Sequence, residues 1–108
     1  MTPMIVLCTC PDHASARSLA TRLVEARLAA CVNLIPGVES IYRWQGAVER
    51  ASEVLLLIKT QAHRLEALQA HILAQHPYEL PEILAVQADS GLEGYLSWIE
   101  QEVRPTDS

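Results

Sequence analysis

CVNLIPGVESIYRWQGAVERASEVLLLIKT, residues 31–60, is the stretch on which the fold depends. Its first part, residues 31–44, has the composition of a long extended strand, and Pro36-Gly37 interrupts it. A proline inside a strand belongs at an edge or a bulge, so we predict a bulge or bend there. Gln45-Gly46 is predicted to form a tight hairpin turn. The chain then returns as a second strand whose polar first half is expected to project beyond the sheet.

Apolar patterns on both sides of this long central hairpin complete the order of elements. Residues 4–10 and 82–88 are short apolar runs, which predict two further strands. Three segments repeat apolar residues at helical spacing: Ala16, Leu19, Ala20, Leu23 and Val24; Leu65, Leu68, Ile72 and Leu73; Leu92, Tyr95, Leu96 and Ile99. The order βαββαβ predicts an α+β, ferredoxin-like sandwich with one antiparallel sheet and an extra C-terminal helix.

The predicted helices carry end signals. Asp12 and Thr60 are expected to cap the first and second helix, and SGLE, residues 90–93, has the form of a capping box. The second helix is expected to end at His76, because a residue that precedes proline avoids the helical region. We expect a frayed tail over residues 101–108.

Length and charge restrict the class of protein. The 108 residues fit a single domain spanning residues 1–108, and the net charge of −5 argues against nucleic acid and anionic membranes as partners. The start of the chain lacks the features of a signal peptide, and the longest apolar run has strand length. We therefore expect a cytoplasmic protein whose three cysteines are free thiols. Uncovered sheet edges and an apolar composition predict an oligomer.

Four blocks in order resemble one family. They are RLAACVNLIPGVESIYRWQG (27–46), EVLLLIKT (53–60), HPYELPEI (76–83) and GYLSWI (94–99), and the likeness covers nearly the whole chain. The sequence is similar to the CutA family of divalent-cation tolerance proteins. This resemblance implies the ferredoxin-like fold, a homotrimer, an architecture shared with the trimeric PII signalling proteins, and a link to copper and divalent-cation tolerance.

The same resemblance nominates metal ligands. Cys8 matches the cysteine of a family motif that has been proposed as a copper ligand, and His76 matches a second proposed ligand. Gln75 stands where some relatives have another histidine, and an amide is a poorer copper ligand. Cys10 is expected to share a face with Cys8, because strand residues two apart do so, and can offer a second thiol. The alternative is that Cys8 and Cys10 are small buried hydrophobic residues.

A second group of candidates is aromatic and polar. Tyr42, Trp44 and Tyr78, with Lys59 and Glu82, are predicted to line a cleft between subunits, or else to pack at the trimer interface.

Enzyme signatures are missing from the sequence, so we expect no catalytic activity. The first functional hypothesis is a cytoplasmic homotrimer that binds copper or other divalent cations weakly and contributes to metal tolerance. The alternative is a PII-like sensor or adaptor that binds a small molecule in the cleft and an unidentified protein partner.

Overall fold

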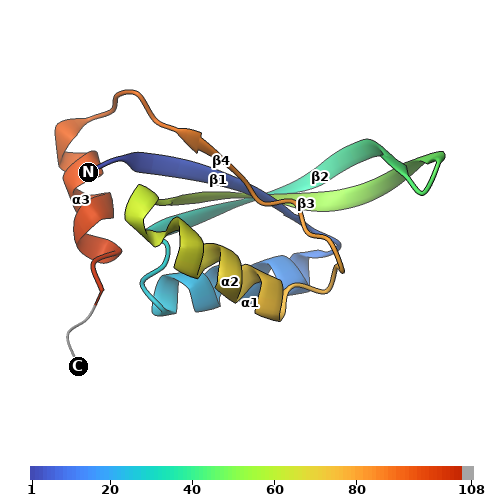
Figure 1. Ribbon diagram of the computed structural model, residues 1–108, viewed down its shortest axis with the longest axis horizontal. Coiled ribbons are helices and arrows are strands. Elements are labelled where there is room, and N and C mark those ends of the chain that lie inside the picture. Colours follow the sequence, from blue (N-terminus) through green and yellow to red (C-terminus); the bar gives the residue numbers. More distant parts are fainter. Residues whose placement is uncertain (106–108) are drawn as a thin grey trace.

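The computed structural model describes residues 1–105 and places four strands in one sheet. In chain order, the elements are β1 (Pro3–Cys10), α1 (His13–Glu25), β2 (Cys31–Trp44), β3 (Ala47–Gln61), a short 3-10 helix (Ala62–Arg64), α2 (Leu65–Gln75), β4 (Leu84–Gln87) and α3 (Glu93–Glu102). The strand order is β2-β3-β1-β4, and every neighbouring pair is antiparallel. This arrangement confirms the predicted ferredoxin-like α+β fold with its additional C-terminal helix (Figure 1).

One face of the sheet holds the core. Helices α1 and α2 lie side by side beneath that face, as Figure 1 shows. Alternate residues of β1 and β3 point toward them, because strand side chains alternate between the faces. The buried side chains shared by sheet and helices include Val6, Cys8, Cys10, Leu19, Leu23, Leu56, Ile58, Leu68 and Ile72.

The long hairpin matches its prediction closely. Strand β2 spans the predicted residues 31–44, and its pairing with β3 shifts register between Ile35 and Val38, which is the bulge expected at Pro36-Gly37. Gln45 and Gly46 both have positive φ, at 49° and 82°, as a two-residue turn of the hairpin type requires. The outer half of the hairpin extends beyond the layer of helices (Figure 1).

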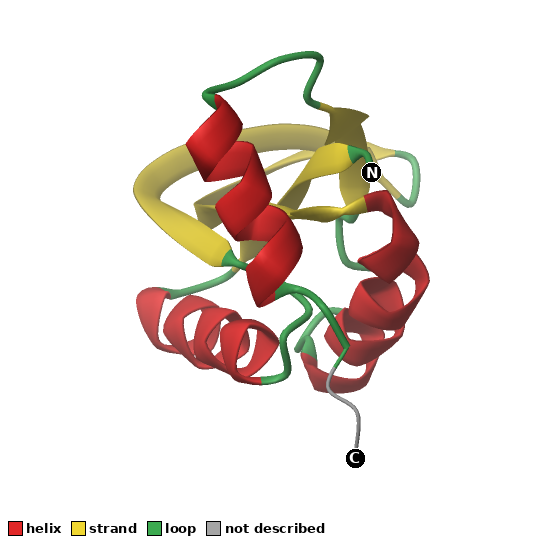
Figure 2. Cartoon of the chain, turned by 90° about the vertical axis from the view of Figure 1, so that its left-hand side faces the viewer, coloured by secondary structure: helices red, strands yellow, loops and turns green. Residues whose placement is uncertain are grey.

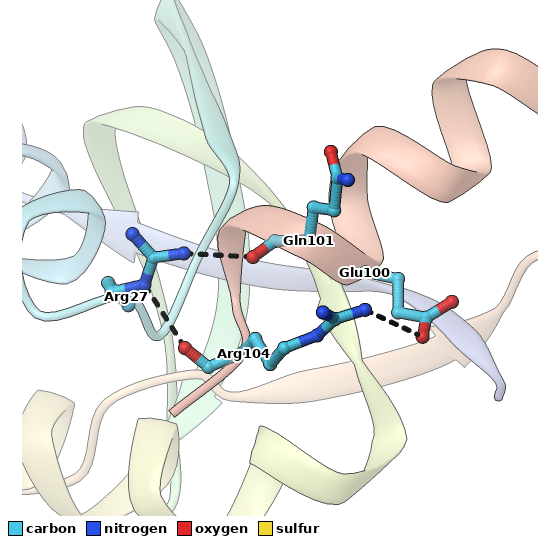
Figure 3. A network of polar contacts seen from close by, with 4 residues as sticks. All are labelled: Arg27, Glu100, Gln101 and Arg104. Atoms are coloured by element: carbon cyan, nitrogen blue, oxygen red, sulfur yellow. Dashed lines mark hydrogen bonds and ion pairs between the residues drawn. The ribbon is translucent and has the colours of Figure 1, made fainter. Parts of the chain in front are cut away.

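Helix α3 lies across the end of the sheet near the start of the chain, nearest the viewer in Figure 2. Arg27, in the connection between α1 and β2, forms hydrogen bonds with the C-terminal end of α3. The guanidinium donates to the backbone carbonyls of Gln101, at 2.8 Å, and Arg104, at 3.1 Å (Figure 3). Arg104 in turn forms an ion pair with Glu100, at 3.6 Å. These contacts hold the helix against a small buried cluster that includes Val103.

The predicted caps fared differently. The Asp12 carboxylate does cap α1, accepting from the Ser15 N–H at 2.7 Å. Thr60 is not a cap: it is the partner of Met4 in the sheet, and its buried hydroxyl donates to the Leu28 carbonyl at 2.7 Å. Pairing with β1 therefore extends β3 past the expected cap to Gln61, and α2 begins only at Leu65.

The prediction of a capping box at residues 90–93 is also wrong. Helix α3 begins at Glu93, its N-cap is Leu92, and no side chain caps it. A side chain at Gly91 would come within 3.1 Å of Leu96, so the glycine lets the chain approach the helix before entering it. Strand β4 is shorter than the predicted residues 82–88.

The prediction of a frayed tail is wrong at its beginning. Residues 101–102 belong to α3 and Val103 is fully buried, while residues 106–108 lie outside the described part of the chain. Four members of the predicted apolar stripes are exposed instead of buried: Val24, Leu73, Leu92 and Tyr95. No helix within residues 1–105 combines the length and apolar character that crossing a bilayer would demand.

Candidate functional site

His76 follows the last residue of α2, and its imidazole ring packs against the end of β1. Residue 76 leaves the helix in an extended conformation, as the following proline requires. Its Nδ1 lies 3.0 Å from the backbone N–H of Tyr78 and accepts from it. The proton therefore sits on Nε2, which donates to the Thr9 carbonyl at 2.7 Å. Both nitrogens have partners, so the buried imidazole is fixed in one tautomer.

The two candidate thiols share the buried face of β1, as predicted, but they have different neighbours. The Cys10 sulfur lies 3.8 Å from Nε2 of His76. The Cys8 thiol instead points to the Thr9 carbonyl, at 3.9 Å. Interaction with Cys10 and burial raise the pKa of Cys8, while interaction with Cys8 lowers the pKa of Cys10. Cys10 is therefore the thiol of this pair that ionises more readily.

A small pocket of about 240 Å³ opens beside Cys10 and His76. Gln75, the residue that departs from the histidine of some relatives, also lines it, and its amide oxygen accepts from Arg22. The pocket therefore carries a positive charge beside the thiol and imidazole.

The Cys10–His76 separation suits a shared metal ion, although the donor set is small. Bonds of about 2.3 Å to sulfur and 2.0–2.1 Å to nitrogen at a tetrahedral angle place the two donors about 3.6 Å apart. The observed separation is 3.8 Å. Within residues 1–105, no group of three His, Cys, Asp or Glu side chains is arranged to hold a metal ion. The residues thus fit a two-donor site, which is a weak one.

A larger cleft of about 800 Å³ lies between the outer half of the hairpin and residues 77–82. Tyr42 and Trp44 line it from β2, while Tyr78 and Glu82 line it from the connection between α2 and β4. Four of the five predicted cleft residues therefore meet in one chain.

Lys59, the fifth predicted cleft residue, lies elsewhere. It pairs with Cys31 at the opposite end of the hairpin, and its ammonium group donates to Asn33. The length of β3 separates it from the aromatic residues, so the structure does not bring it to the cleft.

Two acidic residues of β3 complete the cleft and were not predicted. Glu49 pairs with Tyr42 across the hairpin, and Glu53 is almost fully buried, with 8% of its surface exposed. The Tyr78 hydroxyl donates to the Glu53 carboxylate at 2.7 Å. Burial, and then this carboxylate, raise the pKa of Tyr78, since both disfavour a phenolate. The predicted turn fixes the pairing of Glu49, so counting from the turn was the signal that could have found it.

The fold and these two sites define a small ferredoxin-like protein with a thiol–imidazole pair and an acidic, aromatic cleft. Comparison with protein families matches residues 4–102 to "CutA1 divalent ion tolerance protein". The chain is 46% identical to the divalent-cation tolerance protein CutA of Pectobacterium atrosepticum, over 94% of this chain and 92% of that protein. It is 42% identical to the chloroplastic protein CutA of Arabidopsis thaliana, over 94% of this chain and 56% of that longer protein.

Solved structures agree with these matches. The crystal structure of CutA from Xylella fastidiosa superposes with a TM-score of 0.92 at 47% identity, covering 94% of this chain and 98% of that one. The chain belongs to the CutA1 family of divalent-ion tolerance proteins. These relatives carry the CutA name, and none of them supports the PII-like alternative.

Proposed function

We propose that this chain acts as a cytoplasmic homotrimer in divalent-cation tolerance, and that it binds copper or another thiophilic cation weakly without catalysing a reaction. The observation that carries the binding proposal is the 3.8 Å separation of the Cys10 sulfur and His76 Nε2. Thiolate and imidazole are a suitable donor pair for copper. Because the Cys10 sulfur lies beside the imidazole whereas the Cys8 thiol points to the Thr9 carbonyl, Cys10 is the thiol ligand in this proposal.

Three features make this binding weak. Two donors from one chain leave a copper ion under-coordinated unless another subunit or water completes the set. Nε2 must also give up its proton and its hydrogen bond to Thr9 before it can bind a metal. Arg22, which lines the same pocket, repels a cation.

The exposed apolar surface supports the trimer. Ile41 and Val48 on the outer hairpin, and Leu84 and Val86 on the edge strand β4, are all between 47% and 65% exposed. Unpaired strand edges with apolar side chains favour association between copies. A homotrimer that extends its sheets through these edges would cover them.

Native mass spectrometry on untagged protein, purified without chelators, tests assembly and metal together. We expect a trimer that retains copper at low occupancy. Anaerobic copper titration then compares Cys10→Ser with Cys8→Ser: the first is expected to lower the affinity by at least about tenfold, and the second to change it little. A monomer would contradict the assembly. Equal copper affinities in the wild type and Cys10→Ser would contradict the proposed ligand.

A further inference from the structure

The cleft between the hairpin and residues 77–82 has a distinctive charge. Four carboxylates line it: Glu49, Glu53, Glu79 and Glu82. No Lys, Arg or His among the described residues lines it with them. A cavity whose ionisable walls are acidic attracts cations and repels anions.

Glu53 has no positively charged side chain as a partner within residues 1–105. This carboxylate is more than nine-tenths buried and lines the cavity. Within residues 1–105 its hydrogen-bond partner is the Tyr78 hydroxyl, which occupies one of its two oxygens. The one ion pair in that part of the chain joins Glu100 and Arg104, far along the sequence. A buried carboxylate is stabilised by hydrogen bonds or by a nearby cation, so a positively charged ligand would add to the single hydrogen bond from Tyr78.

The remaining walls favour an organic cation over a metal ion. Aromatic rings of Tyr42, Trp44 and Tyr78 attract ammonium groups through their faces, and Leu80 offers an apolar surface for methylene groups. Since no three potential metal ligands converge within residues 1–105, the carboxylates are spread along the cleft. Spread carboxylates match several charges on one extended molecule better than one point charge.

The size of the cleft agrees with such a ligand. Its volume of about 800 Å³ falls within the range of about 300–1,000 Å³ that is typical of small-molecule sites. We propose that the acidic, aromatic cleft binds a linear aliphatic polyamine, with one ammonium group on the Glu53 carboxylate, others on the carboxylates nearer the surface, and methylene groups against Tyr42 and Trp44. This site is separate from the thiol–imidazole pair and does not depend on metal binding there.

Isothermal titration calorimetry with spermine, spermidine and putrescine tests this inference on the assembled protein. Affinity is expected to rise with the number of amino groups and to fall as salt is added, because the attraction is electrostatic. A neutral diol of matching length serves as the control and is expected to give no heat. The proposal fails if the diol binds as well as spermine, if Mg²⁺ binds in the cleft more tightly than spermine, or if a neighbouring subunit fills the cleft and spermine gives no heat.

Variants identify the site. Glu53→Gln removes the buried charge and is expected to weaken spermine binding about tenfold or more. Trp44→Ala is expected to weaken it about two- to fivefold through loss of the ring face. Trp98→Ala is the matched control, because Trp98 on α3 has the same exposed fraction, 39%, and lies outside the cleft. Unchanged spermine affinity in both cleft variants overturns the proposal.

Two further measurements keep the result interpretable. If Glu53→Gln fails to fold, Glu49→Gln replaces an exposed carboxylate of the same cleft and is expected to weaken binding about threefold or more. Equal affinity in Glu49→Gln and the wild type would then overturn the proposal. Copper titration of the cleft variants is expected to match the wild type, and Cys10→Ser is expected to bind spermine normally. Each site can thus fail without the other.

Discussion

Replacing Tyr78 by Phe tests the polar contact at the floor of the cleft. The substitution keeps the ring and removes the hydroxyl that donates to Glu53 at 2.7 Å. A hydrogen bond to a charged group contributes about 1.5–3 kcal/mol, and the acceptor is almost fully buried, so water cannot replace the lost donor freely. We expect Tyr78→Phe to lower the free energy of unfolding by about 1.5–3 kcal/mol per chain at neutral pH. Tyr42→Phe is the control, because this exposed hydroxyl has no hydrogen-bond partner among the described residues, and it is expected to cost less than about 0.5 kcal/mol.

Alkaline pH gives an independent readout of the same contact. The folded-state pKa of Tyr78 is raised above its unfolded value near 10. The stabilisation is therefore complete below about pH 10 and is lost as pH rises toward the folded-state pKa. Denaturant unfolding at fixed protein concentration should show the wild type converging on Tyr78→Phe above about pH 10. The reasoning is refuted if Tyr78→Phe costs no more than Tyr42→Phe, or if the difference between wild type and Tyr78→Phe is constant up to pH 11.

Three other substitutions have expected outcomes in the same unfolding assay. Ile72→Ala opens a cavity in the core and should cost about 2–5 kcal/mol, whereas Leu73→Ala next to it, on the exposed face, should cost less than about 0.5 kcal/mol. Thr60→Val leaves a buried carbonyl without its donor and should cost about 1–3 kcal/mol, against almost nothing for Thr21→Val on the surface of α1; equal costs would contradict the buried role. Asp12→Ala should destabilise the protein at neutral pH. Because capping lowers the folded-state pKa of this carboxyl, the difference from wild type should shrink as pH falls through that pKa, and a pH-independent difference would contradict a charged cap.

Local signals predicted the hairpin well. The turn at Gln45-Gly46 and the interruption at Pro36-Gly37 depend on backbone preferences of the residues themselves, so their positions could be read from the sequence. Thr60 could not be placed in the same way. Its composition suits a helix cap, but pairing with β1 holds it in the sheet, and that pairing depends on residues far away in the chain.

The sites show the same division between local and distant causes. Alternation along one strand correctly placed Tyr42 and Trp44 together, and the prolines around Tyr78 brought that residue to them. Glu53 was missed because its burial and its contact with Tyr78 depend on residues 77–82, which return to the hairpin from far along the chain. The closeness of Cys10 rather than Cys8 to His76 depends on how the end of α2 meets β1, and no periodicity in either element encodes it.

The bulge in β2 reverses the face of the hairpin on which the even-numbered residues of this strand lie. Before it, Leu34 is paired with Leu56, so even-numbered residues of both strands face the helices; beyond it, Tyr42 is paired with Glu49, an odd-numbered residue on the other face. One extra residue therefore inverts the alternation of β2, while β3 keeps its own alternation along the hairpin. Deleting Gly37 would remove the extra residue, but Tyr42 would still be paired with Glu49 on the same face, because the turn at Gln45-Gly46 fixes that pairing. Without the bulge, the register set by the turn would pair Leu34 with Leu57, on the face away from the helices. The extra residue therefore lets one strand direct Leu34 to the core and Tyr42 to the cleft.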